Sequence, residues 1–260
     1  MATFETMLMV TTLSGLVTGV GAVPVLFGAR VSHRVYDAAL GLAGGIMIAA
    51  SVFGLIIPGT EQGSLWSVMV GVFVGGFGLL VGNRVIPHVH TEYKRWRGHG
   101  GATDEEPTLD DRVRRAILIG GAITLHNAPE GLAMGVAFAS GLEEIAFVLA
   151  IVIGLQNVPD GFAFAVPVSQ AGMPTWRVFA YTTLSGTVPQ VVASVFGFGL
   201  VAIAQGVFPV AAGFAAGAML AVVLREMVPS SHGHGYADAA TAAFLVGFVF
   251  FVVVDAVIGA

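Results

Sequence analysis

Apolar residues in this chain are grouped into long blocks and do not alternate regularly with polar ones. A helix needs about 20 predominantly apolar residues to cross a lipid bilayer. Eight blocks reach that length: 6–28, 38–58, 64–86, 114–139, 144–169, 177–204, 208–229 and 237–259. The pattern therefore predicts an all-α integral membrane protein with eight transmembrane helices.

The polar connections between these blocks are short, with one exception. Residues 87–112 are charged and contain several glycines and histidines, a composition typical of a flexible loop. No second linker interrupts the pattern. We therefore expect one transmembrane domain over residues 1–260, with the flexible loop 87–112 inside it.

Composition narrows the class of protein further. Hydrophobic residues make up 56% of the chain and charged residues 10%, whereas a soluble domain carries about 25% charged residues. The 36 glycines suit helices that pack closely in lipid. The absence of cysteine excludes disulfides and thiolate metal sites. The net charge of -5 gives no indication of nucleic-acid binding, so membrane lipid is the first expected partner.

Basic residues are confined to alternate connections. They are Arg30, Arg34, Arg84, Lys94, Arg95, Arg97, Arg112, Arg114, Arg115 and Arg177, with Arg225 near the same end of the seventh block. The opposite connections hold Glu61, Glu143 and Glu144 but no Lys or Arg. Because basic loops stay cytoplasmic, we expect the 87–112 loop in the cytoplasm and both termini outside the cell (plasma) membrane.

The chain also contains an internal repeat. The segment GLAGGIMIA from Gly41 resembles GFAAGAMLA from Gly213. The second and seventh blocks cross in opposite directions, so the repeat has inverted topology, an arrangement common in transporters. Chance similarity between two helices rich in small residues is the alternative interpretation.

Two polar motifs lie inside the fourth and fifth blocks. HNAPEG begins at His126 and QNVPDG begins at Gln156. Residues four apart share a helix face, so His126 with Glu130, and Gln156 with Asp160, each form a stripe of nitrogen and oxygen ligands. Ionisable groups at membrane depth face a cavity, a partner or an ion because they are costly in lipid.

Each motif also contains an asparagine and a proline. Asn127 and Asn157 lie three residues before the two carboxylates. Pro129 and Pro159 cannot donate a backbone hydrogen bond, so each can kink its helix and free a carbonyl. The alternative is that the polar residues only link helices by hydrogen bonds, but the doubled pattern favours binding of a divalent cation.

These motifs resemble the paired HNxPEG-type motifs of the ZIP (Zrt/Irt-like) divalent metal transporters, in their prokaryotic form. GGIMIAAS on the second block and REMVPSSH on the seventh are also similar to family segments. The resemblance covers nearly the whole chain. It implies a binuclear metal site carried by helices four and five, exposed alternately by movement of a helix bundle against a scaffold.

Carried over by position, the resemblance implies a role for each motif residue. One metal would be held by His126, Glu130, Gln156 and Asp160, with Met47 close by. A second metal would be held by Asn127 and Asn157, with Glu130 and Asp160 shared.

The chain departs from the family pattern at two places. Gln156 and Asp160 stand where the fifth helix often carries His and Glu. On the sixth block, Pro189 and Gln190 stand where Glu and Pro are expected. The second metal position thus lacks one carboxylate and is expected to be weak or vacant.

Further polar residues form a candidate pathway. These are Ser51, Gln190, Glu226, His232 and His234, together with the loop residues His88, His90 and His99. Glu226 is either an exit ligand or a partner of Arg225, and the histidines either pass metal onward or are simply solvated. Met219, the repeat partner of Met47, is interpreted as a packing residue. Asp255 has no assigned role.

The sequence therefore predicts a non-enzymatic transporter that moves divalent metal into the cytoplasm. Imidazole and carboxylate ligands without thiolate suit Zn²⁺ by default, and also Fe²⁺, Mn²⁺, Co²⁺ or Cd²⁺. One alternative is an intramembrane metalloenzyme in which His126 and Glu130 activate water. Another is a metal sensor that does not transport. A homodimer is one assembly that the chain could form.

Overall fold

The computed structural model describes residues 3–28, 31–85, 126–170 and 172–258. The predicted loop 87–112, with His88, His90 and His99, lies outside the described residues. So does the first half of the predicted fourth span.

The described chain is helical and contains no β-strand. Its helices are α1 (Phe4–Val17), α2 (Val23–Leu26), α3 (His33–Ala49), α4 (Ile57–Glu61), α5 (Leu65–Val85), the helical residues 126–139, α8 (Glu143–Gln170), α9 (Thr175–Ile203), α10 (Phe208–Val222), α11 (Val228–Ser231) and α12 (Ala237–Ile258). Short 3₁₀ segments, η1 (Thr18–Ala22) and η3 (Gln205–Val207), and π-helical turns, η2 (Ala50–Ile56) and η4 (Val223–Met227), connect some of them.

Seven of the described helical segments are long and apolar enough to cross a membrane. The all-α membrane fold is confirmed. The count of eight stays a prediction, because the fourth segment is described only from His126 onward. The main boundary difference is at α3, which begins at His33, five residues before the predicted 38. Ser32 caps this helix by accepting a hydrogen bond from the backbone N–H of Val35. The first turn is polar, so hydropathy alone placed the start of the helix too late.

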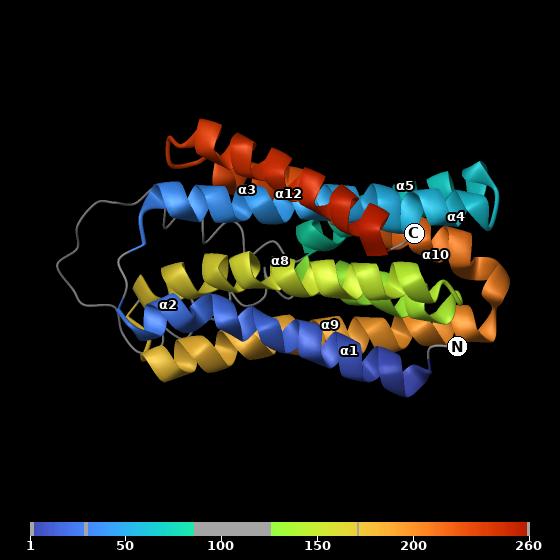
Figure 1. Ribbon diagram of the computed structural model, residues 1–260, viewed down its shortest axis with the longest axis horizontal. Helices are drawn as coiled ribbons and strands as arrows, with labels where there is room; N and C mark the ends of the chain where they lie inside the picture. Colours follow the sequence, from blue (N-terminus) through green and yellow to red (C-terminus); the bar gives the residue numbers. More distant parts are fainter. Residues whose placement is uncertain (1–2, 29–30, 86–125, 171, 259–260) are drawn as a thin grey trace.

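The helices form two bundles (Figure 1). The motif bundle contains α1, η1, α2, the helical residues 126–139, α8 and α9, and the repeat bundle contains α3–α5 and α10–α12. In the repeat bundle α3 packs along α12 and α5 along α10, and among the labelled helices the most extensive contact between the bundles is that of α3 with α8. The predicted metal stripe on α8 therefore belongs to the helix that meets the other bundle.

Glycines bring the backbones together inside each bundle. A Cβ atom on Gly45 would overlap the carbonyl oxygen of Phe244 on α12, and one on Gly131 would overlap that of Gln190 on α9. Between the bundles, Gly54 of η2 lies against the side chain of Leu149 on α8 and not against backbone. The high glycine content thus serves close helix pairing within each bundle, as small residues do in membrane proteins.

The internal repeat is visible in the geometry. Helix α3 leads through the π-turn η2 into α4, and α10 leads through the π-turn η4 into α11. Each short helix has a proline in its first turn, Pro58 and Pro229. Figure 1 shows α3 and α10 running in opposite directions. The structure thus supports an inverted repeat, and π-turns are frequent at functional sites.

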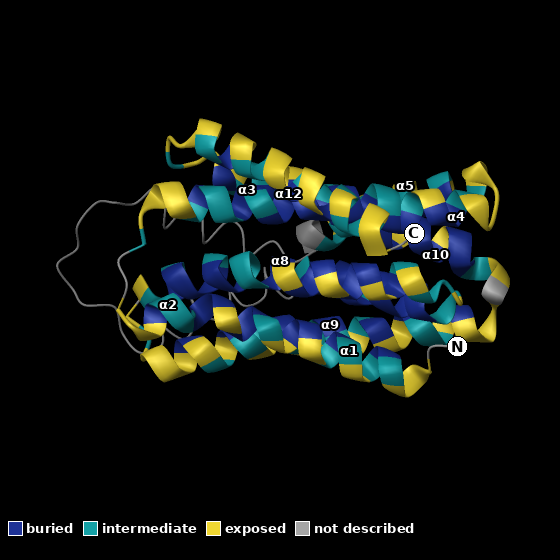
Figure 2. Cartoon of the chain, in the orientation of Figure 1, coloured by how far each residue is buried: buried dark blue, intermediate teal, exposed yellow. Residues whose placement is uncertain are grey.

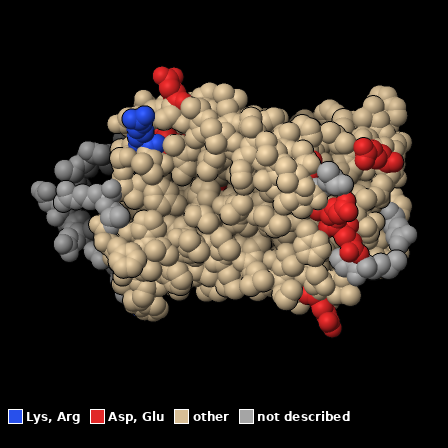
Figure 3. Space-filling model, viewed as in Figure 1, with Lys and Arg blue, Asp and Glu red and all other residues tan. Residues whose placement is uncertain are grey.

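The outer surface suits a lipid environment. Large apolar side chains such as Phe73, Phe196 and Val249 are exposed, and Figure 2 shows exposed positions along the outer faces of α9 and α12. Figure 3 shows most of the visible Asp and Glu near the end of the molecule where Figure 1 places both termini, with Lys and Arg visible at the other end. This distribution agrees with the charge asymmetry in the sequence.

Candidate metal centre

The two motifs meet where the helical residues 126–139 face α8. Nε2 of Gln156 donates a hydrogen bond to Oε1 of Glu130 and another, at 3.4 Å, to Oδ2 of Asp160. Glu130 and Gln156 are fully buried. Three of the predicted ligands are therefore in one place, and a single amide group links the two carboxylates.

This cluster contains oxygen atoms that the protein leaves unsatisfied. Oε2 of Glu130 and Oε1 of Gln156 are buried and have no hydrogen-bond partner among the described residues. A buried carboxylate is costly unless a positive charge or enough donors compensate it. The donor set of carboxylate and amide oxygens is suitable for a divalent cation, which would enter here as substrate.

His126 contacts the other bundle. Its Nε2 lies 3.1 Å from Oε2 of Glu226 on η4, so the first residue of the HNAPEG motif pairs with the repeat bundle. Both interpretations offered for Glu226, as an exit ligand and as a partner of Arg225, stay predictions. Within residues 3–28, 31–85, 126–170 and 172–258, no three His, Asp or Glu side chains are placed to hold one metal ion. The candidate ligands are thus adjacent without being closed around an ion.

Met47 and Ser51 lie at the junction of α3 and η2. Met47 is buried in the core cluster that also contains Met134 and Leu149 of the motif bundle, a position compatible with the expected nearness to the site. Met219 belongs to the same cluster, in agreement with a packing role. Ser51 is buried and donates its hydroxyl to the carbonyl of Met47 at 2.7 Å, so its hydroxyl is used within its own helix.

A second polar cluster adjoins the first on α8. Nδ2 of Asn157 donates to the carbonyl of Ser14 at 2.8 Å and to Oε1 of Gln190 at 3.0 Å. Nε2 of Gln190 lies 3.1 Å from Oγ of Ser14 and 3.3 Å from Sδ of Met134. Of the residues predicted around the second metal position, Asn157 is thus engaged through its nitrogen in an amide network inside the motif bundle, while its buried Oδ1 has no hydrogen-bond partner among the described residues. Asn127, also expected there, is buried.

Ser14 is a member of this network that the sequence interpretation missed. It lies on α1 in line with Thr11 and Thr18, which are also buried. Residues three and four apart share a helix face, so the spacing of these three hydroxyl residues was a usable signal of a polar stripe facing the motif helices.

The remaining candidates lie away from this centre. His232 places Nδ1 3.0 Å from the carbonyl of Val228 and Nε2 3.2 Å from the hydroxyl of Thr241. His234 contacts Asp37 on α3. Asp255 is partly exposed near the last turn of α12, which agrees with a hydrated position.

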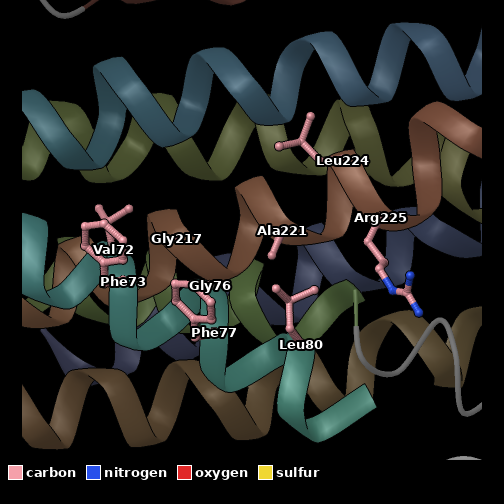
Figure 4. Close-up of a pocket in the computed structure, with 9 residues that line it drawn as sticks. All are labelled: Val72, Phe73, Gly76, Phe77, Leu80, Gly217, Ala221, Leu224 and Arg225. Atoms are coloured by element: carbon pink, nitrogen blue, oxygen red, sulfur yellow. The ribbon is translucent and has the colours of Figure 1, made fainter. Parts of the chain in front are cut away.

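An apolar groove of about 410 Å³ lies between α5 and α10. Figure 4 shows its lining, which includes Phe73, Phe77 and Leu224, with Arg225 at one end. None of the predicted metal ligands lines it. Its apolar walls and the exposure of Phe73 and Phe77 identify it as part of the surface that faces lipid.

The chain is similar in sequence to known proteins of one family. The family model described as ZIP Zinc transporter matches residues 88–255. The chain belongs to the ZIP family. It is 35% identical to zinc transporter GufA of Myxococcus xanthus over 95% of this chain and 96% of the relative. It is also 35% identical to zinc transporter ZIPB of Bordetella bronchiseptica (93% and 78%) and 29% identical to human zinc transporter ZIP11 (93% and 94%).

Membership confirms the resemblance drawn from the HNAPEG and QNVPDG motifs. The bacterial relatives of this ZIP protein are named zinc transporters. This agrees with the expectation that the chain is a transporter and not an enzyme. The assignment of individual ligands remains a prediction.

Proposed function

We propose that this ZIP protein transports divalent transition-metal ions, zinc foremost, across the membrane into the cytoplasm. The observation that carries the proposal is the fully buried Glu130 carboxylate, linked to Asp160 through the amide of Gln156, with an unsatisfied oxygen on both Glu130 and Gln156. The names of the bacterial relatives support zinc as the substrate.

Metal entry would require a change at Gln156. Its nitrogen now donates to both carboxylates, whereas a cation needs oxygen or unprotonated nitrogen ligands. Rotation of the carboxamide by half a turn would bring Oε1 toward Glu130 and Asp160 and remove the donor. His126 would complete the ligand set on leaving Glu226. The cation then replaces an N–H group as the positive partner of the two carboxylates.

The two bundles offer a basis for alternating access. Inside each bundle, glycine contacts hold the backbones together, and the described polar links between the bundles include His126 with Glu226 and the Tyr36 hydroxyl with the carbonyl of Ala163 at 3.3 Å. We propose that the bundles move as rigid units and that the His126–Glu226 contact breaks when a metal recruits His126. Binding would thereby be coupled to movement.

Several finer features belong to the same proposal. Fe²⁺, Mn²⁺, Co²⁺ and Cd²⁺ are further substrates to be tested, and a homodimer is the assembly to be tested. Pro189 and Gln190 stand on α9 where a glutamate and a proline are expected, so one carboxylate is missing, which favours a single tightly held metal with the second position weak. Residues 87–112 would be a cytoplasmic loop within one domain, and both termini would be extracellular at the plasma membrane.

Zinc uptake into proteoliposomes tests the transport proposal directly. Purified protein should take up Zn²⁺ above protein-free vesicles, and the other four cations should compete according to their fit to the site. A folded protein that binds zinc without flux would instead be a sensor. Metal-dependent hydrolysis of a membrane substrate without flux would favour the metalloenzyme.

The orientation has its own test. Cysteines introduced singly at Thr3 and Thr103 should react with an impermeant reagent from opposite sides of intact cells, because basic residues concentrate around the loop that contains Thr103. The native chain contains no cysteine, so labelling reports only the introduced site. Labelling of both positions from outside would contradict the proposed topology.

A further inference from the structure

A separate group of histidine and aspartate side chains lies at the opposite end of the repeat bundle from the chain termini (Figure 1). Asp37 on α3 is completely buried. Its Oδ1 lies 2.7 Å from Nδ1 of His234, in the turn between α11 and α12. The ring of His33 is stacked on that of His234, with centroids 4.5 Å apart and planes 13° apart. The transport site does not use any of these three residues.

Asp37 is in an unusual environment for a carboxylate. Its Oδ2 is buried and has no hydrogen-bond partner in the part of the chain that the structure describes. A buried carboxylate with a single partner is costly unless further positive charge is supplied. A cation held by the neighbouring imidazole would supply that charge without displacing the existing hydrogen bond.

The contact with Asp37 also selects the nitrogen that can bind metal. When Nδ1–H of a histidine donates to a carboxylate, Nε2 carries the lone pair. This carboxylate–histidine arrangement is the usual support of a metal-ligating histidine, whose ring it orients and whose basicity it raises. His234 therefore has the tautomer and the ring orientation expected of a metal-ligating histidine.

His33 supplies a second imidazole. It lies four residues before Asp37 and hence on the same face of α3, with its side chain exposed. The two ring planes are nearly parallel, so one ring must turn before both can bind the same ion. His33 is exposed, and rotation of its side chain out of the stack would let both rings reach the roughly 2.0–2.1 Å Zn–N distance.

We propose that His33 and His234 form a binding site for a divalent transition metal, with Asp37 as the residue that orients His234. Two protein ligands, with water completing the coordination, make a weaker site than the transport centre, which suits an ion on its way to release. Tyr36 contacts the ring of His234 edge-on and reaches Ala163 of the motif bundle, so the site adjoins the bundle interface. The release role rests on the proposed function, but the binding of metal does not.

The test uses the full chain with its transport centre disabled by Glu130→Gln and Asp160→Asn. This protein, purified in detergent, is titrated with Co²⁺ by visible absorption and with Zn²⁺ by calorimetry. We expect residual binding that weakens at least about tenfold with His33→Ala or His234→Ala. Asp37→Asn should weaken it about 10–100-fold, as loss of an orienting carboxylate does.

His232→Ala is the matched control. Both ring nitrogens of His232 lie within hydrogen-bonding distance of protein oxygens, so this substitution should leave the residual affinity unchanged. His88, His90 and His99 remain in every variant, and only the difference between variants reports the proposed site. If Asp37→Asn does not fold, the exposed His33→Ala variant still decides the question, with metal-free thermal unfolding as the folding check.

The proposal is overturned if the disabled protein folds but binds no metal, or if its residual binding survives His33→Ala combined with His234→Ala. A purely structural contact predicts that His234→Ala lowers the metal-free melting temperature and leaves metal affinity unchanged. Zinc flux by the parent protein is measured separately. Its absence, with residual binding intact, would reject the transport proposal and leave this site standing.

Discussion

Two polar clusters on α8 differ in charge. The first joins Glu130, Gln156 and Asp160, carries two carboxylates and contains oxygens without a donor. The second joins Asn157 to Gln190 and Ser14 and is neutral, although Oδ1 of Asn157 is also buried without a hydrogen-bond partner among the described residues. The first therefore has the electrostatics of a cation site, and the second has those of a contact between helices.

Their separation follows from helix geometry. Consecutive residues on an α-helix point about 100° apart, so Gln156 and Asn157 cannot share a face. Asn157 faces α1 and α9 within its own bundle, whereas Gln156 faces Glu130 near the contact of His126 with η4. One motif thus provides both a face with candidate metal ligands and a face that joins helices.

The largest expected effect comes from Glu130→Gln. The substitution keeps the shape of a fully buried side chain and removes a charge that would face the metal. Loss of one partner of a buried charge pair costs about 3–5 kcal/mol, so zinc affinity should fall by roughly two to three orders of magnitude. Zinc flux into proteoliposomes and the zinc-induced shift in melting temperature should both be lost.

Without metal, this variant should be no less stable than the parent, because one of two neighbouring buried carboxylates is gone. Metal-free thermal unfolding is therefore its control. A folded Glu130→Gln protein with the parental zinc shift and the parental flux would show that the first cluster, like the second, only joins helices.

A smaller effect of a different kind is expected from Gln190→Ala. The change removes the amide that accepts from Asn157 and donates to Ser14. Loss of hydrogen bonds in a buried network should lower the free energy of unfolding by about 1–3 kcal/mol. Because no charge is removed, zinc affinity should change less than it does in Glu130→Gln.

Chemical denaturation with and without zinc measures both quantities. Ser194→Ala is a matched control on α9, since its hydroxyl is buried but bonds only locally, to the carbonyl of Val191 at 2.9 Å. If Gln190→Ala weakened zinc binding as severely as Glu130→Gln, the second cluster would be part of the metal site and the contrast would disappear.

The helices and the first cluster could be predicted from the sequence, whereas the contrast with the second could not, because Asn157 was expected to be a metal ligand. Hydropathy located the helices because lipid imposes a minimum apolar length, and the doubled motif brought together Glu130, Gln156 and Asp160 because residues four apart share a face. The spacing could not predict that His126 contacts Glu226. These residues are about a hundred positions apart in the sequence, and their contact depends on how the two bundles pack against each other. Nor could it predict that Asn157 bonds to Ser14, which comes from a helix without the motif.

The smallest expected effect, and the most discriminating one, concerns Gln156→His combined with Asp160→Glu. Both changes move α8 toward the commoner family motif, and Gln156 is the residue that links the carboxylates. An imidazole supplies a lone pair where the amide now donates, which favours zinc over harder cations such as Mn²⁺. We expect zinc preference over Mn²⁺ to rise by about tenfold, equivalent to about 1.4 kcal/mol, with an unchanged melting temperature without metal. Competition of Mn²⁺ against zinc uptake measures this preference. The control is Ser14→Ala in the second cluster, which should lower stability by removing the hydroxyl that accepts from Gln190 and leave the preference as it was. If the double variant kept the parental competition profile, the Gln156 face of α8 would not contact the ion, and the two clusters would have to be assigned the same structural role.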